Sequence, residues 1–212
     1  YIIMPRIFFF AVVVSLVVLL AFRSGEAKKP VPFNIAEYKA KRVIRCSPDW
    51  NELKTWIEET DIPPMPGAGK YKWKISTKND SAQFYFNQGI NMYYGFHIIE
   101  AMASFKKAAR FDPNCAILYW AQALGYGPNI NDFGYRASPD ALAALNKAKE
   151  FSSSASAFEK DLIQAMTVRY TADSTDVTRI QLNQAYTGKM KILYEKYGSV
   201  ADAQALYADA MM

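Results

Sequence analysis

The sequence predicts an all-α protein in which antiparallel helix pairs stack into a right-handed solenoid. Apolar residues recur at helical spacing in successive segments, and residues that start or stop helices separate those segments. The 212 residues are 51% hydrophobic and 21% charged, which is enough for one globular or repeat domain. The net charge of +5 comes without a basic stripe interleaved with aromatic residues, so we expect no nucleic-acid partner.

The most complete unit covers residues 81–113. Its apolar residues fall at helical spacing in two runs: Tyr85, Gly89 and Met92, then Ile98, Ala101, Phe105 and Ala108. Gly95 separates the two runs, which predicts an antiparallel helix pair. Gly89 and Ala101 lie where the two helices would cross, because small side chains allow a close approach there. Phe105 is predicted to fill the space beside the crossing.

The pattern continues along the chain in two further units. The second unit repeats the spacing at Tyr119, Ala123, Tyr126, Ala141, Leu145 and Ala148, with an inserted loop, GPNINDFGYR, at residues 127–136. Ser156 and Glu159 form a capping-box pattern that opens a third pair, whose second helix is predicted from about Val177 to Tyr197. The chain stops inside a further helical segment, so we expect a continuation beyond Met212 that covers the last apolar face.

These units resemble the tetratricopeptide repeat (TPR), a helix pair with a period of about 34 residues. Residues 75–131 are similar to a group of exported bacterial TPR proteins that share an AQ-FF-QG run, an EA-SF-AA-DP helix and a GPNIN loop. The chain departs from the repeat at Gln88, where an aliphatic residue is usual. It departs from the group at His97 and Ile98, where Asn-His is often found. The resemblance implies the fold and export from the cytoplasm, and no particular chemistry.

The N-terminal segment, residues 1–27, is predicted to be a signal peptide or a membrane anchor. The uncharged run from Ile7 to Phe22 has 16 residues, just short of the ~20 that span a bilayer as a helix. Small residues allow cleavage after Ala27, which favours a signal peptide. More positive charge follows the run than precedes it, which is compatible with an uncleaved anchor in contact with the membrane. We expect an exported protein, either periplasmic or anchored to the membrane and facing the periplasm.

Three more regions complete the expected organisation. Residues 28–45 are basic and proline-containing without a sustained period, and are predicted to be a tether. Residues 46–80 are predicted to hold a cap helix, opened by Ser47-Pro48 and ending near Thr60, followed by an extended segment rich in proline and glycine. Residues 81–212 hold the repeats.

Candidates for chemistry are few. The chain has one histidine, so any metal or catalytic arrangement would have to use His97, which Glu100 follows at a distance of three residues. One hypothesis is a small-ligand, metal or redox site formed by His97, Cys115 and the loop Gly127–Asp132. The alternative is that His97 is a turn residue bonded to the backbone. Motifs for hydrolases, phosphate loops and CxxC sites are lacking, so we expect no enzymatic activity, cofactor or metal.

The two cysteines and the aromatic residues give the remaining candidates. Cys46 and Cys115 could form a disulfide in an exported protein, or could both be free thiols. Most aromatic rings are expected to pack between helices, but repeat proteins also use aromatic residues to anchor a protein or peptide partner. The candidate partner-binding residues are Tyr94, His97, Tyr126, Asn129 and Asn131.

Overall fold

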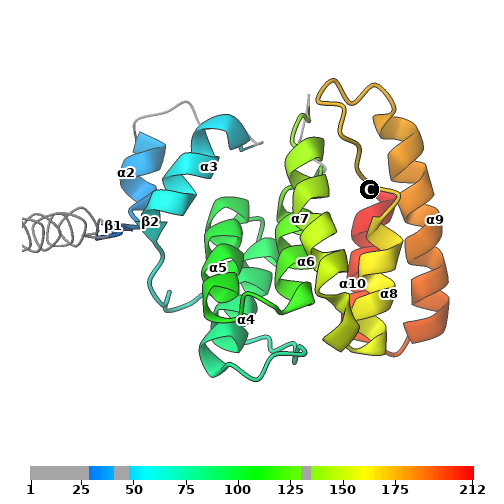
Figure 1. Ribbon diagram of the computed structural model, residues 1–212, viewed down its shortest axis with the longest axis horizontal. Helices are drawn as coiled ribbons and strands as arrows, with labels where there is room; N and C mark the ends of the chain where they lie inside the picture. Colours follow the sequence, from blue (N-terminus) through cyan, green and yellow to red (C-terminus); the bar gives the residue numbers. More distant parts are fainter. Residues whose placement is uncertain (1–28, 41–47, 130–134) are drawn as a thin grey trace, which may run out of the picture. The chain divides into compact units, whose positions relative to one another are not determined.

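The computed structural model describes residues 29–40, 48–129 and 135–212 (Figure 1). The chain divides into two compact units, Tyr1–Val31 and Pro32–Met212, and the second unit contains nearly all of the described residues. The expected signal or anchor run, Ile7 to Phe22, lies outside the described residues. In the part of the chain that is described, no helix is both long enough and apolar enough to cross a membrane.

The described residues are mostly helical, which confirms the all-α class. The helices are α2 (Ile35–Ala40), α3 (Trp50–Glu59), α4 (Asp80–Tyr94), α5 (Ile98–Phe111), α6 (Ala116–Gly125), α7 (Ser138–Glu150), α8 (Ala157–Met166), α9 (Arg179–Tyr197) and α10 (Ala201–Met211). A single 3-10 turn, η1 (Ser152–Ser154), lies between α7 and α8. Two-residue strands β1 (Val31–Pro32) and β2 (Thr60–Asp61) form one small sheet.

Helices that are neighbours in the chain are the main packing partners. The most extensive contacts join α4 to α5, α6 to α7, and α9 to α10, and further contacts join α5 to α6 and α8 to α9. Figure 1 shows α4 beside α5 and α6 beside α7. The predicted capping box opens α8: Ser156 N–H donates to Glu159 at 2.8 Å and Glu159 N–H donates to Ser156 at 3.3 Å.

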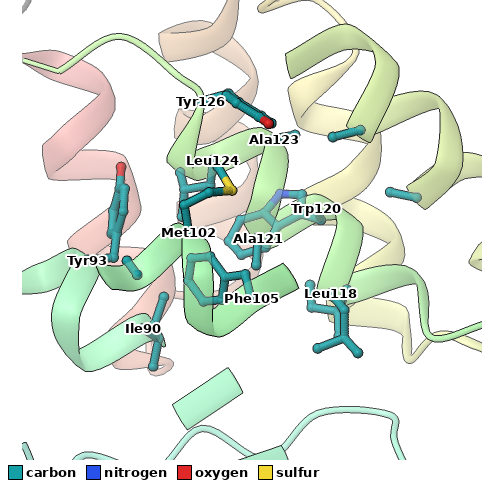
Figure 2. Close-up of a cluster of buried hydrophobic side chains, with 14 of the residues drawn as sticks. Ile90, Tyr93, Met102, Phe105, Leu118, Trp120, Ala121, Ala123, Leu124 and Tyr126 are labelled. Atoms are coloured by element: carbon teal, nitrogen blue, oxygen red, sulfur yellow. The ribbon is translucent and has the colours of Figure 1, made fainter. Parts of the chain in front are cut away.

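Helices α4 and α5 pack closely at Gly89, as the sequence predicts. A Cβ atom at Gly89 would lie 2.5 Å from Cδ1 of Phe105 and 3.2 Å from the carbonyl oxygen of Ala101. Ala101 and Phe105 are fully buried. In Figure 2 the Phe105 ring lies in the core close to Met102 and Trp120. The small residue at 89 is therefore what leaves room for the Phe105 ring.

The extended segment after α3, residues 62–79, runs along α4 and is called the arm below. Amide side chains on one face of α4 bind alternate residues of the arm; they are Gln83, Asn87 and Asn91, and we call them the amide ladder. The N–H groups of Tyr71, Trp73 and Ile75 donate to Asn91, Asn87 and Gln83, each at 3.1 Å. Four helical residues rise about 6 Å and two extended residues about 6.6 Å, so the two spacings match.

Gln88 holds the start of the arm. It is buried, and its Oε1 accepts a hydrogen bond from Met65 N–H at 2.9 Å. Its Nε2 donates to the carbonyl oxygen of Pro63 at 3.2 Å and to the hydroxyl of Ser104 on α5 at 3.1 Å. Position 88 usually holds an aliphatic residue in the repeat. The glutamine found here instead satisfies polar groups of the arm.

The predicted tether contains a short helix, and the predicted start of the cap helix is wrong. Residues 35–40 form α2, and the rings of Phe33 and Tyr38 pack on Trp56 of α3 at 4.7 and 4.6 Å. Helix α3 begins at Trp50 rather than after Ser47-Pro48, since the Asp49 side chain caps it by accepting from a backbone N–H at 3.1 Å.

The variant Gly89→Ala should lower the free energy of unfolding by about 2 kcal/mol, because the added methyl group overlaps the Phe105 ring and overpacking typically outweighs the gain in helix propensity. The measurement is urea unfolding followed by circular dichroism. Gly188→Ala on α9 is the matched control, because nothing lies within 4 Å of a Cβ there. It should stabilise by about 0.5 to 1 kcal/mol. If both variants changed the free energy of unfolding equally, the close packing of α4 and α5 at Gly89 would be contradicted.

The variant Gln88→Leu should also destabilise, although leucine is closer to the usual repeat residue. The change leaves the Met65 N–H and the Pro63 carbonyl oxygen without their partner, which costs about 2 kcal/mol or more. Gln181→Leu, at an exposed position of α9, should change the free energy by less than about 0.5 kcal/mol. Unfolding in urea compares the two, and a neutral Gln88→Leu would show that the arm does not need Gln88.

Candidate functional site

The structure separates the residues of the predicted His97–Cys115 site. His97 precedes the first residue of α5, whereas Cys115 follows its end. The 14 residues of α5 make it about 21 Å long. One site therefore cannot use both side chains, and that hypothesis is wrong. Within the described ranges, no group of three or more His, Cys, Asp or Glu residues is arranged to hold a metal ion.

Cys115 is buried at the start of α6, and it has no disulfide partner among the described residues. Burial, with a smaller contribution from Asp112, raises its pKa to about 12, so the thiol is protonated and unreactive at neutral pH. Cys46 lies outside the described residues. The Cys46–Cys115 disulfide therefore stays a prediction.

Tyr126 is a core residue, and its predicted place on a binding surface is wrong. Only 4% of it is exposed, and its ring packs edge-on against Trp50 of α3 at 4.8 Å. Figure 2 shows it among the buried side chains. The position beside an inserted loop suggests exposure, but α3 covers the ring from a distant part of the sequence.

The end of α4 and its connection to α5 present two more of the predicted residues, Tyr94 and His97, together with Phe96. We call these three residues the aromatic turn. The side chain of His97 is 58% exposed, and its Nδ1 lies 3.8 Å from Oε1 of Glu100. Tyr94 is partly exposed, and its hydroxyl donates to Asp202 of α10 at 2.9 Å. Burial, together with the charge of Asp202 and this bond to it, raises the pKa of Tyr94, so the hydroxyl stays protonated and acts as a donor.

Phe96 occupies a backbone conformation that glycine usually takes. Helix α4 ends in a Schellman motif, in which Phe96 N–H donates to Tyr93 at 2.9 Å and His97 N–H donates to Met92 at 2.8 Å. The motif requires a left-handed residue, and Phe96 supplies it with φ of +60°, while the preceding Gly95 has φ of −85°. The ring of Phe96 is 60% exposed.

A second candidate is a cavity of about 490 Å³ between the loop after α6, α9 and α10. We call it the Arg169 cavity. Pro128 and Asn129 from the predicted loop line it, together with Arg169 from the segment after α8, Tyr186 from α9 and Asp209 from α10. Asn131 and the rest of the loop up to residue 134 lie outside the described residues. The loop is thus beside a cavity, but its neighbours there are not His97 and Cys115.

Arg169 is buried with part of its guanidinium unsatisfied. Only 4% of the residue is exposed, and its Nη2 donates to the carbonyl oxygen of Pro128 at 3.2 Å. Its Cζ lies 4.3 Å from the centre of the Tyr186 ring. Nε and Nη1 have no hydrogen-bond partner with good geometry, and neither does the Tyr186 hydroxyl, although the hydroxyls of Tyr170 and Tyr186 lie near the guanidinium. Buried polar groups in proteins are almost always bonded, so these donors are expected to bind a partner outside the described chain, such as a water molecule, an ion or a ligand.

Asp209 is the acidic group of the same cavity. Burial raises its pKa, and the nearby Arg169 only partly opposes this effect. Its carboxyl accepts a hydrogen bond from the Tyr93 hydroxyl at 3.4 Å, a long and weak contact.

The sequence did not predict the central residues of this cavity, Arg169, Tyr186 and Asp209. They come from three separate segments of the chain. The one local signal is the placement of Arg169 in MTVRY, between apolar and aromatic neighbours, which is unusual for an exposed arginine. Comparison of the chain with family models, curated proteins and solved structures finds no match.

The variant Asp209→Asn should raise the free energy of unfolding at neutral pH. The pKa of Asp209 is higher in the folded than in the unfolded protein, where it is near 3.8. Asp209 therefore contributes to the stability of the fold below the unfolded pKa, and this contribution is lost as the pH rises through the folded pKa. The gain from the variant should therefore be largest at pH 7 and disappear in acid. Urea unfolding at pH 7 and pH 4 measures it.

Asp161→Asn is the control with the opposite sign. Hydrogen bonds from Lys196 and Tyr197 outweigh desolvation and lower the pKa of Asp161, so its contribution is present at neutral pH and lost in acid. A loss of stability at pH 7 in Asp209→Asn would show that its charge is favourable where it lies.

Proposed function

We propose that the chain is a non-catalytic scaffold that binds a protein or peptide partner, built as a TPR-like right-handed solenoid. The support for this architecture is the succession of packed helix pairs α4–α5, α6–α7 and α8–α9. Helical repeats present extended surfaces for partners, with aromatic anchors on them. The residues we place in contact with the partner are those of the aromatic turn.

The observation that carries this proposal is the conformation and exposure of Phe96. A left-handed conformation costs a residue with a Cβ atom about 1 kcal/mol or more relative to glycine. An exposed ring gains little from burial in return, since 60% of Phe96 faces solvent. Strain of this kind is concentrated at functional positions in proteins. A partner that buries the ring would supply the missing compensation.

The surroundings of Phe96 suit a binding surface. The hydroxyls of Tyr71 and Tyr94 both donate to Asp202, at 2.5 and 2.9 Å, which holds the turn on α10. The position of the ring is therefore fixed before a partner arrives, and less entropy is lost on binding. His97 adds an exposed polar group at the edge of this apolar surface, as the rim of an interface requires.

The variant Phe96→Gly should separate binding from folding. Glycine suits the left-handed position, so the variant should be more stable by about 1 kcal/mol, while partner binding should be lost with the ring. A photo-reactive amino acid at position 96 should cross-link a discrete partner in the source cells. The same group at Ile192, which is also 60% exposed, should not. Cross-linking at both positions, or partner binding that survives Phe96→Gly, would contradict the proposal.

We also propose that the protein is exported, and that it is periplasmic or anchored facing the periplasm. The support is the apolar run Ile7 to Phe22 with its flanking charges. A fusion of residues 4–40 to a reporter enzyme that is active only outside the cytoplasm should be active. The same fusion without residues 7–22 should be inactive. An inactive full fusion, present at normal levels, would contradict export.

A further inference from the structure

We propose that the Arg169 cavity binds a small organic monocarboxylate with an apolar chain. The site is separate from the aromatic turn, and the inference does not depend on the proposed partner. A volume of about 490 Å³ lies within the range of small-molecule pockets.

The unsatisfied guanidinium defines the charge of the ligand. Arg169 is buried, and its Nε and Nη1 have no acceptor. A carboxylate supplies both the acceptor oxygens and the negative charge that a buried guanidinium needs. Among the described residues that line the cavity, Arg169 is the one cation and Asp209 is the one acid. A dianion such as phosphate would bring two negative charges beside the carboxyl of Asp209, whose neutral form is favoured by its raised pKa, so a monoanion fits best.

The arginine closest to it along the chain shows what a structural arginine looks like in this protein. Arg179 donates to Asp176 at 2.7 Å and to the carbonyl oxygen of Arg169 at 2.6 Å, and its Cζ lies 5.1 Å from the Tyr135 ring centre. Arg179 thus has a carboxylate partner from its own segment. Arg169 has a carbonyl oxygen and an aromatic ring but no carboxylate bonded to it within the described chain. A carboxylate on the ligand would give Arg169 the same three kinds of partner that Arg179 has.

The rest of the lining indicates the tail of the ligand. Ile180, Met211 and Met212 are large apolar residues that line the cavity, and Ile180 is 71% exposed. They provide an apolar surface at its outer side, where an alkyl or aryl chain would cover them. The unpaired hydroxyl of Tyr186 adds one polar contact inside.

Calorimetric titration of the purified full chain with hexanoate at neutral pH tests the proposal. We expect saturable binding at one site, and no binding of hexan-1-ol, which has the same chain without the charge. Arg169→Lys should weaken hexanoate binding at least tenfold, because lysine lacks the planar set of donors. Phe96→Gly is the control and should leave the affinity unchanged, because Phe96 belongs to the aromatic turn and does not line the cavity.

An exposed position gives a test that does not depend on replacing a buried residue. Ile180 is 71% exposed, so charged variants should fold. Ile180→Asp should weaken hexanoate binding several-fold, and Ile180→Lys should strengthen it. Absence of saturable binding to the wild type would overturn the proposal. Equal affinities of the two Ile180 variants, or equal binding of hexan-1-ol and hexanoate, would overturn it as well.

Discussion

The close approach of α4 and α5 at Gly89 is the constraint on which the rest of the fold depends. With no side chain at Gly89, the Phe105 ring can lie against the backbone of α4 and still reach the core around Trp120 (Figure 2). The other neighbour of α5 also uses a glycine, because a Cβ at Gly125 of α6 would lie 2.9 Å from Cε of Met102. Helix α5 is thus packed tightly from two sides. This packing fixes α4, which carries the arm, and the end of α6, from which the cavity loop leaves.

The parts of the structure that follow from local periodicity could be predicted from the sequence. The crossing at Gly89 and the capping box of α8 both rest on residues a few positions apart, whose side-chain directions are set by the helix itself. The aromatic turn shows the limit of this reasoning. Glycine is the expected left-handed residue, but the hydrogen bonds of the turn place Phe96 there, one position after Gly95.

The errors and omissions concern residues whose environment comes from distant segments. Tyr126 is buried because α3, more than sixty residues earlier, places Trp50 on its ring. The Arg169 cavity needs the loop after α6, the end of α8 and α10 at once, and no spacing within any one of them indicates that they meet. Both proposed sites also share a cost in stability, which is a strained backbone at Phe96 and an unsatisfied buried cation at Arg169. Sequences that fold well deviate from local rules mainly where function requires it.

The amide ladder has a consequence for how the arm can pair with α4. Its bonds use alternate residues of the arm, and the side chains of Trp73 and Ile75 are buried there while Lys72 and Lys74 are exposed. A slip of one residue would turn the tryptophan out to solvent and push Lys72 or Lys74 into an apolar space. A slip of two residues would restore the alternation but place a lysine-flanked tyrosine where Trp73 meets Trp120 at 5.7 Å. The arm can therefore pair with α4 in one register. The amide ladder on α4 fixes this register, as the hydrogen bonds of a neighbouring strand fix it in a sheet.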